Sequence, residues 1–516
     1  MCISLLSKVM TMGKNVVYLT FIITITLFSC SATEEETVVE KPNIIVFYVD
    51  DLGYGDVGSY GATAVKTPNV DRLAASGVRF TDGHCTAATC TPSRYSLLTG
   101  NYAFRNNAAI LPGDAPLLID TAVQTLPKML KSVGYRTAVV GKWHLGLGYG
   151  QINWNQQISP GANEIGFDYS FLIPATGDRV PTVFVEDGLV LGLDPSDPIT
   201  VSYKENIDPN PIGLEIPDSL KQLADTQHSQ TVVNGISRIG YMTGGYAARW
   251  VDEEFPYVLN GQAKEFIAQD PAKPFFLYYS FHDIHVPRAP NEKFQGITAM
   301  GPRGDAIAQM DWAVGDILDE LETKGLLENT LVIFSSDNGP VLDDGYSDGA
   351  VENIGAHNPS GGYKGGKYSA FEAGTRVPTI VYWKGKVQAV ESDALISQID
   401  LLGSLAALTG ATVSDQVIDS ENYLDAWLGK DLVGRKDMLE ESFTIALRSE
   451  NWKYIKPFDG NTPDWLANKD IAVGLTDEPQ LYNLDEDQDE SENLAATYPE
   501  KVKELDQKLT QVLNKK

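Results

Sequence analysis

The segment "KPNIIVFYVDDLGYGDVG", residues 41–58, decides the fold class. Ile44 to Val49 form a continuous run of β-branched and aromatic residues, a pattern that predicts a strand buried on both faces. Such strands are typical of parallel sheets covered by helices. The run ends directly in Asp50 and Asp51 and a glycine-rich turn, so two carboxylates follow the strand.

The same pattern, a buried strand that ends in polar residues, recurs along the chain. The later examples are "YRTAVVGKWHLG" with Lys142 and His144, "KPFFLYYSFHDIHVP" with His282, Asp283 and His285, and "NTLVIFSSDNGP" with Asp337 and Asn338. Amphipathic segments between them predict helices. Alternating strands and helices predict an α/β fold, in which ligands bind at the carboxyl ends of the strands.

Two regions are predicted from this pattern. Residues 41–412 should form a large, mixed and mostly parallel sheet with helices on both faces. Residues 413–516 should form a smaller α+β subdomain of antiparallel strands with a terminal amphipathic helix. Within the first region, residues 170–245 are rich in Pro, Gly and Asp and predict a long insertion over the site.

The N-terminus predicts export. The mostly apolar run from Val16 to Phe28 is too short for a membrane span and contains polar threonines. "LFSC" resembles a bacterial lipobox, so residues 1–30 are predicted to be a lipoprotein signal with Cys30 lipidated. Ordinary signal-peptidase cleavage is the alternative. Residues 31–40 are predicted to be a polar tether. We expect a bacterial protein of the periplasm or, as a lipoprotein, of the outer membrane or cell surface.

The chain is acidic, with 40 Lys and Arg against 69 Asp and Glu and a formal net charge of −29. This charge argues against a nucleic-acid partner, because phosphate binding needs a basic surface. It also argues that an anionic substrate would be held by a few local cations or by a metal ion. Membrane attachment is expected only through a lipid anchor.

The segment "CTPSR", residues 90–94, contains one of only four cysteines. Thr91 is suited to cap a helix and Pro92 to open it. Cys90 then lies at a helix N-terminus, where free amides and the helix dipole favour a nucleophile or an anion. A disulfide with Cys85 would close a very small loop, and a zinc site lacks further ligands, so neither is expected.

The polar residues at the strand ends suggest a metal and acid–base chemistry. Hard oxygen donors follow two of the predicted strands: Asp50 and Asp51 after the first strand, and Asp337 and Asn338 after the last. Such donors select calcium or magnesium. Taken alone, each such pair is more often a turn or a helix cap. His144 and His285 lie at strand ends near glycine or proline, which suits a general acid or base, although a strand histidine is usually a satisfied core residue. Lys367 is flanked by glycines that leave it free to enter a site, or else to lie on a flexible surface loop.

Together these motifs resemble a known family. "CTPSRYSLLTG" is similar to the signature of the type I sulfatases of the alkaline phosphatase superfamily. Further segments follow in that family's order: "VDDLGYGDVG", "GKWHLG", "IHVP", "SDNGP", "GGKYSAFEAGTRVP" and "LYNLDEDQDESENL". The resemblance covers residue 42 to the C-terminus. "EAG", residues 372–374, departs from it, since the family usually has two glycines there, which affects local backbone geometry.

The resemblance implies an alkaline phosphatase-like fold and a sulfuric ester hydrolase. A maturation enzyme would oxidise Cys90 to formylglycine, whose hydrate attacks the sulfur of a sulfate ester. The implied ligands of one divalent cation, most often Ca²⁺ with Mg²⁺ possible, are Asp50, Asp51, the modified Cys90, Asp337 and Asn338. The implied catalytic residues are Cys90, Arg94, Lys142, His144, His285 and Lys367. Of these, Lys142, His285 and Lys367 would bind the sulfate, and His144 would act as the base that regenerates the aldehyde.

The substrate is expected to be a sulfated carbohydrate, either an algal polysaccharide such as ulvan or carrageenan, or a glycosaminoglycan. Asp178 and Arg179, in the long insertion, and Arg288, after "IHVP", are the candidate sugar contacts. Two alternatives stay open: a phosphatase or phosphonate monoester hydrolase of the same superfamily, and a catalytically inactive glycan-binding lipoprotein.

Overall fold

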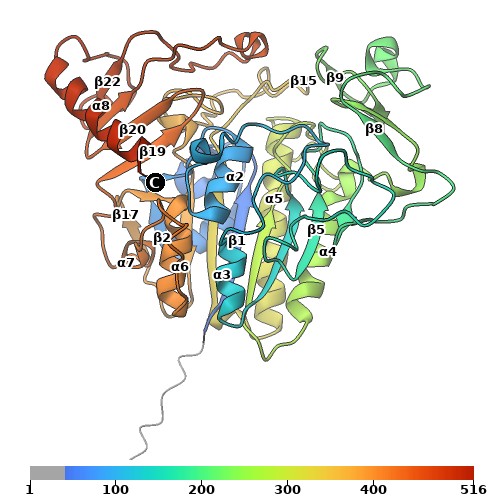
Figure 1. Cartoon of the computed structure of the whole chain (residues 1–516), viewed down its shortest axis with the longest axis horizontal. Helices are drawn as coiled ribbons and strands as arrows, with labels where there is room; N and C mark the ends of the chain where they lie inside the picture. Colours follow the sequence, from blue (N-terminus) through green and yellow to red (C-terminus); the bar gives the residue numbers. More distant parts are fainter. Residues whose placement is uncertain (1–40, 516) are drawn as a thin grey trace, which may run out of the picture. The chain divides into compact units, whose positions relative to one another are not determined.

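Ten strands form one mixed sheet in the computed structural model, which describes residues 41–515 (Figure 1). Their order across the sheet is β17 (Val390–Ser392), β2 (Val78–Phe80), β16 (Thr379–Tyr382), β14 (Thr330–Ser336), β1 (Asn43–Val49), β13 (Phe275–Ser280), β4 (Arg136–Lys142), β5 (Tyr169–Ile173), β6 (Val185–Glu186) and β7 (Leu189–Val190). The central strands β14, β1, β13, β4 and β5 are parallel, whereas β16 and β6 join antiparallel. The predicted α/β sheet is confirmed.

Helices cover both faces of this sheet. Alternate residues of β1 point to opposite sides, because successive side chains of a strand alternate. Ile45 and Phe47 pack in one core with α1 (Pro68–Ser76), α4 (Phe255–Ala268) and α5 (Pro302–Thr323). Ile44 and Val46 pack in the other core with α2 (Cys90–Thr99), α3 (Leu126–Ser132) and α6 (Leu401–Thr409). With both faces covered, every residue of β1 is buried, as its continuous apolar run predicts.

The C-terminal part forms an antiparallel sheet, as predicted. Its four strands are β19 (Asp437–Glu441), β20 (Ile445–Ser449), β21 (Trp452–Ile455) and β22 (Gln480–Asn483). Helix α8 (Pro499–Leu513) packs on this sheet through Leu505 and Leu509. From Lys41 onward the chain packs as one compact unit, so the predicted division after residue 412 stays a prediction.

The insertion predicted over residues 170–245 begins too early, because β5, β6 and β7 lie between residues 169 and 190 and belong to the main sheet. The rest of the predicted range contains short strands outside the main sheet. Two pairs lie within it, β8 (Thr200–Ser202) with β12 (Tyr241–Thr243) and β10 (Val232–Val233) with β11 (Ile236–Ser237). A third pair joins β9 (Leu223–Ala224) to β15 (Tyr346–Ser347), which follows the end of β14. The insertion is therefore tied to the loop that leaves the carboxyl end of the main sheet.

The predicted signal segment, residues 1–30 with Cys30, and the tether, residues 31–40, lie outside the described residues. In the part of the chain that the structure describes, we find no helix with the length and apolar character needed to cross a membrane.

Candidate active site

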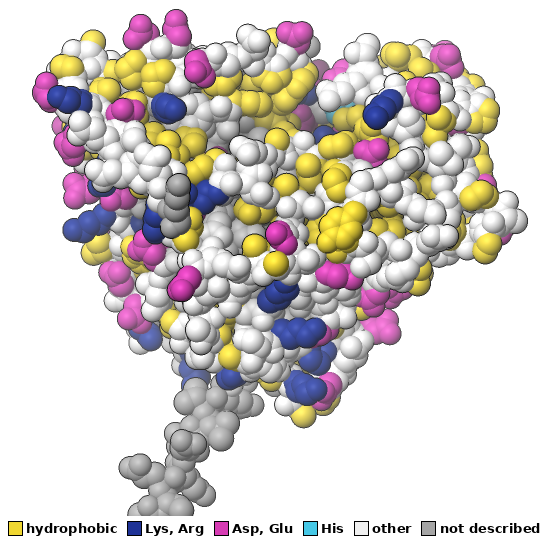
Figure 2. Space-filling view, viewed as in Figure 1, with side chains coloured by type: hydrophobic (Ala, Val, Ile, Leu, Met, Phe, Trp, Pro, Cys, Tyr) yellow, Lys and Arg dark blue, Asp and Glu magenta, His cyan; other side chains and the backbone are white. Residues whose placement is uncertain are grey.

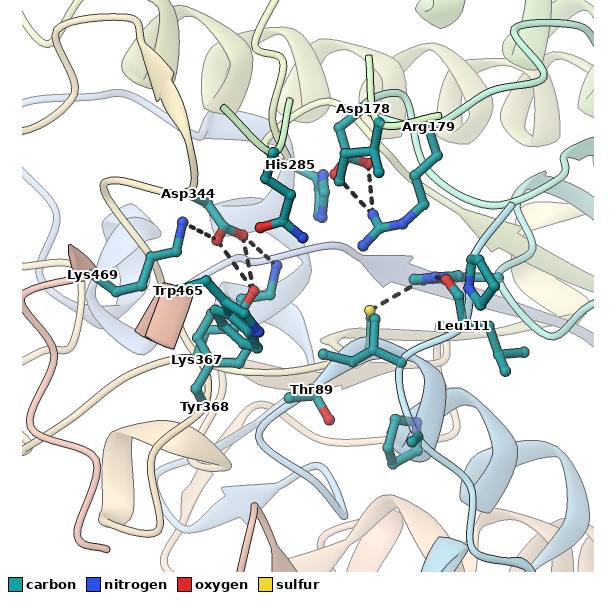
Figure 3. Close-up of a pocket in the computed structure, with 18 of the residues that line it drawn as sticks. Thr89, Leu111, Asp178, Arg179, His285, Asp344, Lys367, Tyr368, Trp465 and Lys469 are labelled. Carbon is teal, nitrogen blue, oxygen red and sulfur yellow. Dashed lines mark hydrogen bonds and ion pairs between the residues drawn. The ribbon is translucent and has the colours of Figure 1, made fainter. Parts of the chain in front are cut away.

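The site forms where β1, β14 and β4 end. Strands β1 and β14 are paired in register up to Val49 and Ser336, so Asp50 and Asp337 leave the sheet side by side. The polar residues that the sequence placed at the strand ends therefore meet at one edge of the sheet. Above them lies a cavity of about 440 Å³ that contains Cys90 (Figure 3).

A buried acidic cluster lies at this edge. Carboxylate oxygens of Asp50, Asp51 and Asp337 lie within 4.8 Å of one another, and all three residues are fully buried. Burial raises the pKa of Asp50 to about 8, although Lys142 beside it acts in the opposite direction. Three buried carboxylates so close together repel one another, and a bound cation would relieve that repulsion.

Two oxygen atoms of the cluster have no hydrogen-bond partner within the described chain, and both fit a hard cation. Asn338 Nδ2 donates to Asp51 Oδ1 at 2.7 Å and to Gly339 O at 2.9 Å, which leaves Asn338 Oδ1 unpaired. Asp50 Oδ1 is likewise unpaired. Buried polar atoms are rarely left unsatisfied, and carboxylate and amide oxygens are the ligands that Ca²⁺ and Mg²⁺ prefer. The predicted ligand set thus fits a divalent cation.

Arg94 steadies this cluster from helix α2. Its Nε donates to Asp337 Oδ2 at 2.9 Å, and its Nη2 lies 2.7 Å from the same oxygen. Burial works to raise the pKa of Asp337, but Arg94, Lys142 and Lys367 hold it below its ordinary value. The cationic side chains therefore keep Asp337 ionised, as a metal ligand must be.

Helix α2 begins two residues earlier than the capping pattern suggested. The prediction that Thr91 caps the helix is wrong: Thr89 occupies the N-cap position, and Cys90 is already helical. The Thr91 hydroxyl instead donates to the backbone carbonyl of His144 at 3.0 Å. This bond ties the first turn of α2 to the end of β4, and it fixes Cys90 opposite His144.

Cys90 and His144 form a close pair. Cys90 Sγ lies 3.2 Å from His144 Nδ1, and His144 Nε2 lies 2.8 Å from the carbonyl oxygen of Leu111. Since a carbonyl only accepts, Nε2 carries the proton and Nδ1 presents a lone pair to residue 90. Burial, followed by the charge of Lys142, lowers the pKa of His144, so the ring is a neutral base.

The thiol of Cys90 is a poor nucleophile in this position. Burial raises its pKa even though Lys142 and Lys367 favour the thiolate. Because the thiolate is the reactive form, the unmodified cysteine is not activated. Both Cys85 and Cys90 are free and buried, so the pair forms no disulfide.

Two lysines and a second histidine complete the polar edge. Lys142 Nζ donates to Asp50 Oδ2, and Lys367 Nζ donates to Asp51 Oδ2 at 2.9 Å. His285 Nδ1 lies 2.6 Å from the Val286 carbonyl oxygen, so Nε2 faces the site. Burial, together with Lys367 and Lys142, lowers the pKa of His285.

Of the three candidate sugar contacts, two line the cavity. Asp178 is buried there and accepts from Arg179 Nη1 at 2.8 Å through each of its oxygens. A third residue that the sequence did not suggest, His228, places its Nε2 3.5 Å from Asp178 Oδ2. Asp178 therefore orients two cationic or polar groups toward the cavity.

Arg288 is not in the cavity, which contradicts its prediction as a substrate contact. Its guanidinium is fully buried and donates to Ile284 O, Leu342 O, Val341 O and Asp348 Oδ2 at 2.7–2.9 Å. With its donors directed at these protein acceptors, Arg288 secures the loop after β14.

Several cavity residues could not be recognised in the sequence. They are His228, Asp344, Tyr368, Phe443, Trp465 and Lys469. Two signals were available: Asp344 follows the recognised "SDNGP" segment closely, and Tyr368 directly follows Lys367 in the recognised "GGKYSAFEAGTRVP" segment. The last three come from the C-terminal part, where no local pattern marks them as site residues.

Comparison with known proteins agrees with this geometry. The profile of the Sulfatase family matches residues 42–179 and 219–411. The chain belongs to the sulfatase family. An N-acetylgalactosamine-6-O-sulfatase of Bacteroides thetaiotaomicron is 49% identical over 478 residues, which is 92% of this sulfatase and 93% of the relative. Human arylsulfatase A is 30% identical over 498 residues, 91% of this sulfatase and 87% of the relative.

A solved structure from Bacteroides thetaiotaomicron, described in work on the metabolism of multiple glycosaminoglycans, is similar throughout. It has a TM-score of 0.89 and 49% sequence identity over 92% of this sulfatase and 99% of that chain. The resemblance read from the sequence motifs is confirmed, and the protein is a sulfuric ester hydrolase. The phosphatase and inactive alternatives are not favoured.

Proposed function

We propose that this sulfatase removes the 6-O-sulfate of N-acetylgalactosamine in a sulfated glycosaminoglycan. The observation that supports the sugar is the 49% identity, over nearly the full length, to a relative named for that activity. The observation that supports the chemistry is Cys90, which lies at the start of α2 between the lone pair of His144 and the acidic cluster with its lysines. Algal polysaccharides are the runner-up substrates.

The proposed cofactors are a single divalent cation and a formylglycine at position 90. Asp50, Asp51, Asp337, Asn338 and modified Cys90 would hold the cation, with Ca²⁺ favoured and Mg²⁺ second. When present, the cation supplies Lewis-acid polarisation of the sulfate, and the formylglycine hydrate supplies the nucleophile. A formylglycine-generating or other sulfatase-maturing enzyme is the proposed partner for the conversion of Cys90.

The residues of the chain then have distinct tasks. Lys142 and Lys367 neutralise the sulfate oxygens, and His144 Nδ1 accepts a proton from the group at position 90. His285 protonates the leaving sugar oxygen. Its lowered pKa stems from burial and from the two lysines, so an anion bound between them would raise that pKa and let Nε2 carry a proton.

The Cys90→Ala variant tests the proposal. Removing the side chain that is proposed to become the nucleophile should lower the rate of sulfate release from N-acetylgalactosamine 6-sulfate by at least about 10³-fold. Sulfate is measured by ion chromatography, and the matched control is Cys85→Ala, which removes the other buried thiol. Equal sulfate release by wild type and Cys90→Ala would contradict the proposed chemistry. Turnover of the 4-sulfate instead of the 6-sulfate would contradict the proposed position.

Arg179 and Asp178 are proposed to bind the sugar. The Arg179→Ala variant should raise KM for the sulfated glycan more than it lowers kcat, because its proposed contact is to the sugar and not to the reacting sulfate. Unchanged kinetics on the glycan would contradict this role. We also propose that residues 1–30 direct export as a lipoprotein signal; membrane fractions of cells that produce wild type and Cys30→Ala test the anchor.

A further inference from the structure

Asp344 lies at the centre of a cluster of donors on one wall of the cavity (Figure 3). Its Oδ2 accepts from Lys367 Nζ at 2.9 Å, its Oδ1 lies 3.2 Å from Lys469 Nζ, and the Tyr368 hydroxyl donates to it at 3.2 Å. Burial works to raise the pKa of Asp344, but the two lysines hold it well below its ordinary value. The carboxylate is therefore a fixed negative charge between two ammonium groups.

Lys367 has two carboxylate partners of different kinds. Its Nζ is 2.9 Å from Asp51 Oδ2 and 2.9 Å from Asp344 Oδ2. Asp51 belongs to the acidic cluster, whereas Asp344 lies in the loop after β14. Without Asp344, Asp51 would be the one carboxylate left in an ion pair with the Lys367 ammonium in the described chain. Asp344 supplies the opposing attraction that holds Nζ at the cavity wall.

The C-terminal part contributes an ion-pair partner for Asp344, the side chain of Lys469. The 3-10 helix η11 (Asp464–Asn468), between β21 and β22, carries Trp465 and is followed directly by Lys469. The Trp465 ring packs edge-on against the Tyr368 ring, with centroids 5.0 Å apart. Lys469 is almost fully buried, and Asp344 is its carboxylate partner in the described chain. One short segment thus contacts both Asp344 and the tyrosine beside Lys367.

We propose that Asp344 is a positioning residue for the sulfate-binding lysine Lys367, and that Lys469 completes the site by holding Asp344 from the C-terminal part. This inference rests on the proposed role of Lys367. Lys469 pairs with Oδ1 of the Asp344 carboxylate, and Oδ2 accepts from Lys367 Nζ. In this proposal the segment that follows β21 helps to position Lys367, because its Lys469 pairs with Asp344.

The decisive experiment is a double-mutant cycle of Asp344→Asn and Lys367→Ala, with kcat and KM measured for sulfate release from N-acetylgalactosamine 6-sulfate. Asp344→Asn keeps the side-chain shape but removes the charge, and it should lower kcat/KM by about 10- to 100-fold. In the Lys367→Ala background the same substitution should change kcat/KM by less than about 2-fold, because Asp344 acts through the missing lysine. A full additional loss in that background would overturn the inference.

The second pair of variants tests Lys469. Lys469→Met should lower kcat/KM, and Lys469→Arg should restore most of it, because the guanidinium can also pair with Asp344. Equal losses in both variants would overturn the role assigned to the positive charge. The matched control is Lys364→Met on the glycine-rich loop that carries Lys367, because the Lys364 Nζ donates to the Glu490 carbonyl oxygen outside the cavity. The Tm of each variant, compared with that of wild type, checks that the variant is folded.

Binding of inorganic sulfate by calorimetry separates this inference from the proposed function. If wild type binds sulfate and Asp344→Asn binds it more weakly, the positioning role is supported whichever sugar is the substrate. If Asp344→Asn binds sulfate as tightly as wild type, the inference fails. If instead wild type binds sulfate tightly but does not turn over N-acetylgalactosamine 6-sulfate, the proposed substrate fails, and the positioning role is decided by the affinity of the variant.

Discussion

At the residue scale, local backbone geometry gives His144 its role. The residue has a positive φ of 53°, which is uncommon for a side chain with a Cβ, and it directly follows the Trp143 that is fully buried in the core. With this backbone conformation, the imidazole Nδ1 faces Cys90 Sγ and Nε2 donates to the Leu111 carbonyl oxygen. The cost of the strained backbone is offset by the packing that fixes it, as is common at functional sites.

The acidic cluster predicts that a cation stabilises the fold. Adding Ca²⁺ or Mg²⁺ to metal-stripped protein should raise Tm, because a ligand bound only to the folded state adds RT ln(1 + [L]/Kd), about 2.7 kcal/mol at 100 times Kd. Differential scanning calorimetry measures the shift. The Asp50→Ala variant should lose most of it, whereas Asp319→Ala, an exposed aspartate far along α5, should keep it. An equal shift in all three proteins would show that the cation binds elsewhere.

At the element scale, strand β19 supports the segment that leads into α2. The Ala88 N–H donates to Glu441 O at 2.7 Å, and the Glu441 N–H donates to Thr86 O at 2.9 Å. The edge of the small sheet thus continues into the backbone just before Cys90. The start of α2, and with it the position of Cys90, depends on a strand that lies some 350 residues later in the chain.

The Glu441 side chain predicts a pH effect on stability. Burial raises its pKa from 4.5 to about 8, against the hydrogen bonds from Ala103 and Phe104; Asp419 raises the pKa further and Arg105 lowers it. Between these two values the unfolded chain loses the proton that the folded chain keeps, so this group lowers the free energy of unfolding as pH rises. Below pH 4.5 it has no such effect.

The Glu441→Gln variant should remove this pH dependence, because glutamine keeps the acceptor for the Ala103 N–H but does not ionise. Urea unfolding at several pH values between 5 and 9 should show that the variant gains stability over wild type as pH rises. Glu478→Gln, at an exposed position, is the control. Parallel curves for wild type and Glu441→Gln would contradict the prediction.

At the scale of the whole molecule, the C-terminal antiparallel sheet and the larger part of the chain pack together in one hydrophobic core. Tyr102 and Ile399, from the larger part, lie in one core with Leu439, Leu447 and Leu505 from the smaller part. Acidic and basic side chains are both spread over the face seen in Figure 2. With a formal net charge of −29, we expect an anionic substrate to be attracted by the cations gathered in the cavity.

A chain that ends at residue 412 tests how far the two parts depend on each other. Residues 41–412 alone would expose the apolar residues of the shared core and would leave Asp344 without Lys469. We expect this fragment to lack a cooperative thermal transition and to release no sulfate. Circular dichroism and size-exclusion chromatography measure the outcome. A monomeric fragment that melts cooperatively would instead show that the predicted boundary separates independent domains.

The sequence by itself determined the sheet, the strand ends and the chemistry of the site. Strand periodicity is local, so the apolar run before Asp50 and Asp51 was enough to predict a buried parallel strand, and parallel pairing brings such strand ends to one edge. The "CTPSR" motif likewise pointed to Cys90 as the proposed reacting residue, although not to the residue at which its helix begins.

Only the tertiary structure decided which side chains complete the cavity. Arg288 follows a recognised motif, yet its donors are directed at the loop after β14, while Asp344 and Lys469 meet from segments more than 100 residues apart. Such partnerships depend on how loops close over the sheet and on which buried charge finds an opposite one. No local pattern in the sequence encodes that choice, because burial and pairing are properties of the folded chain.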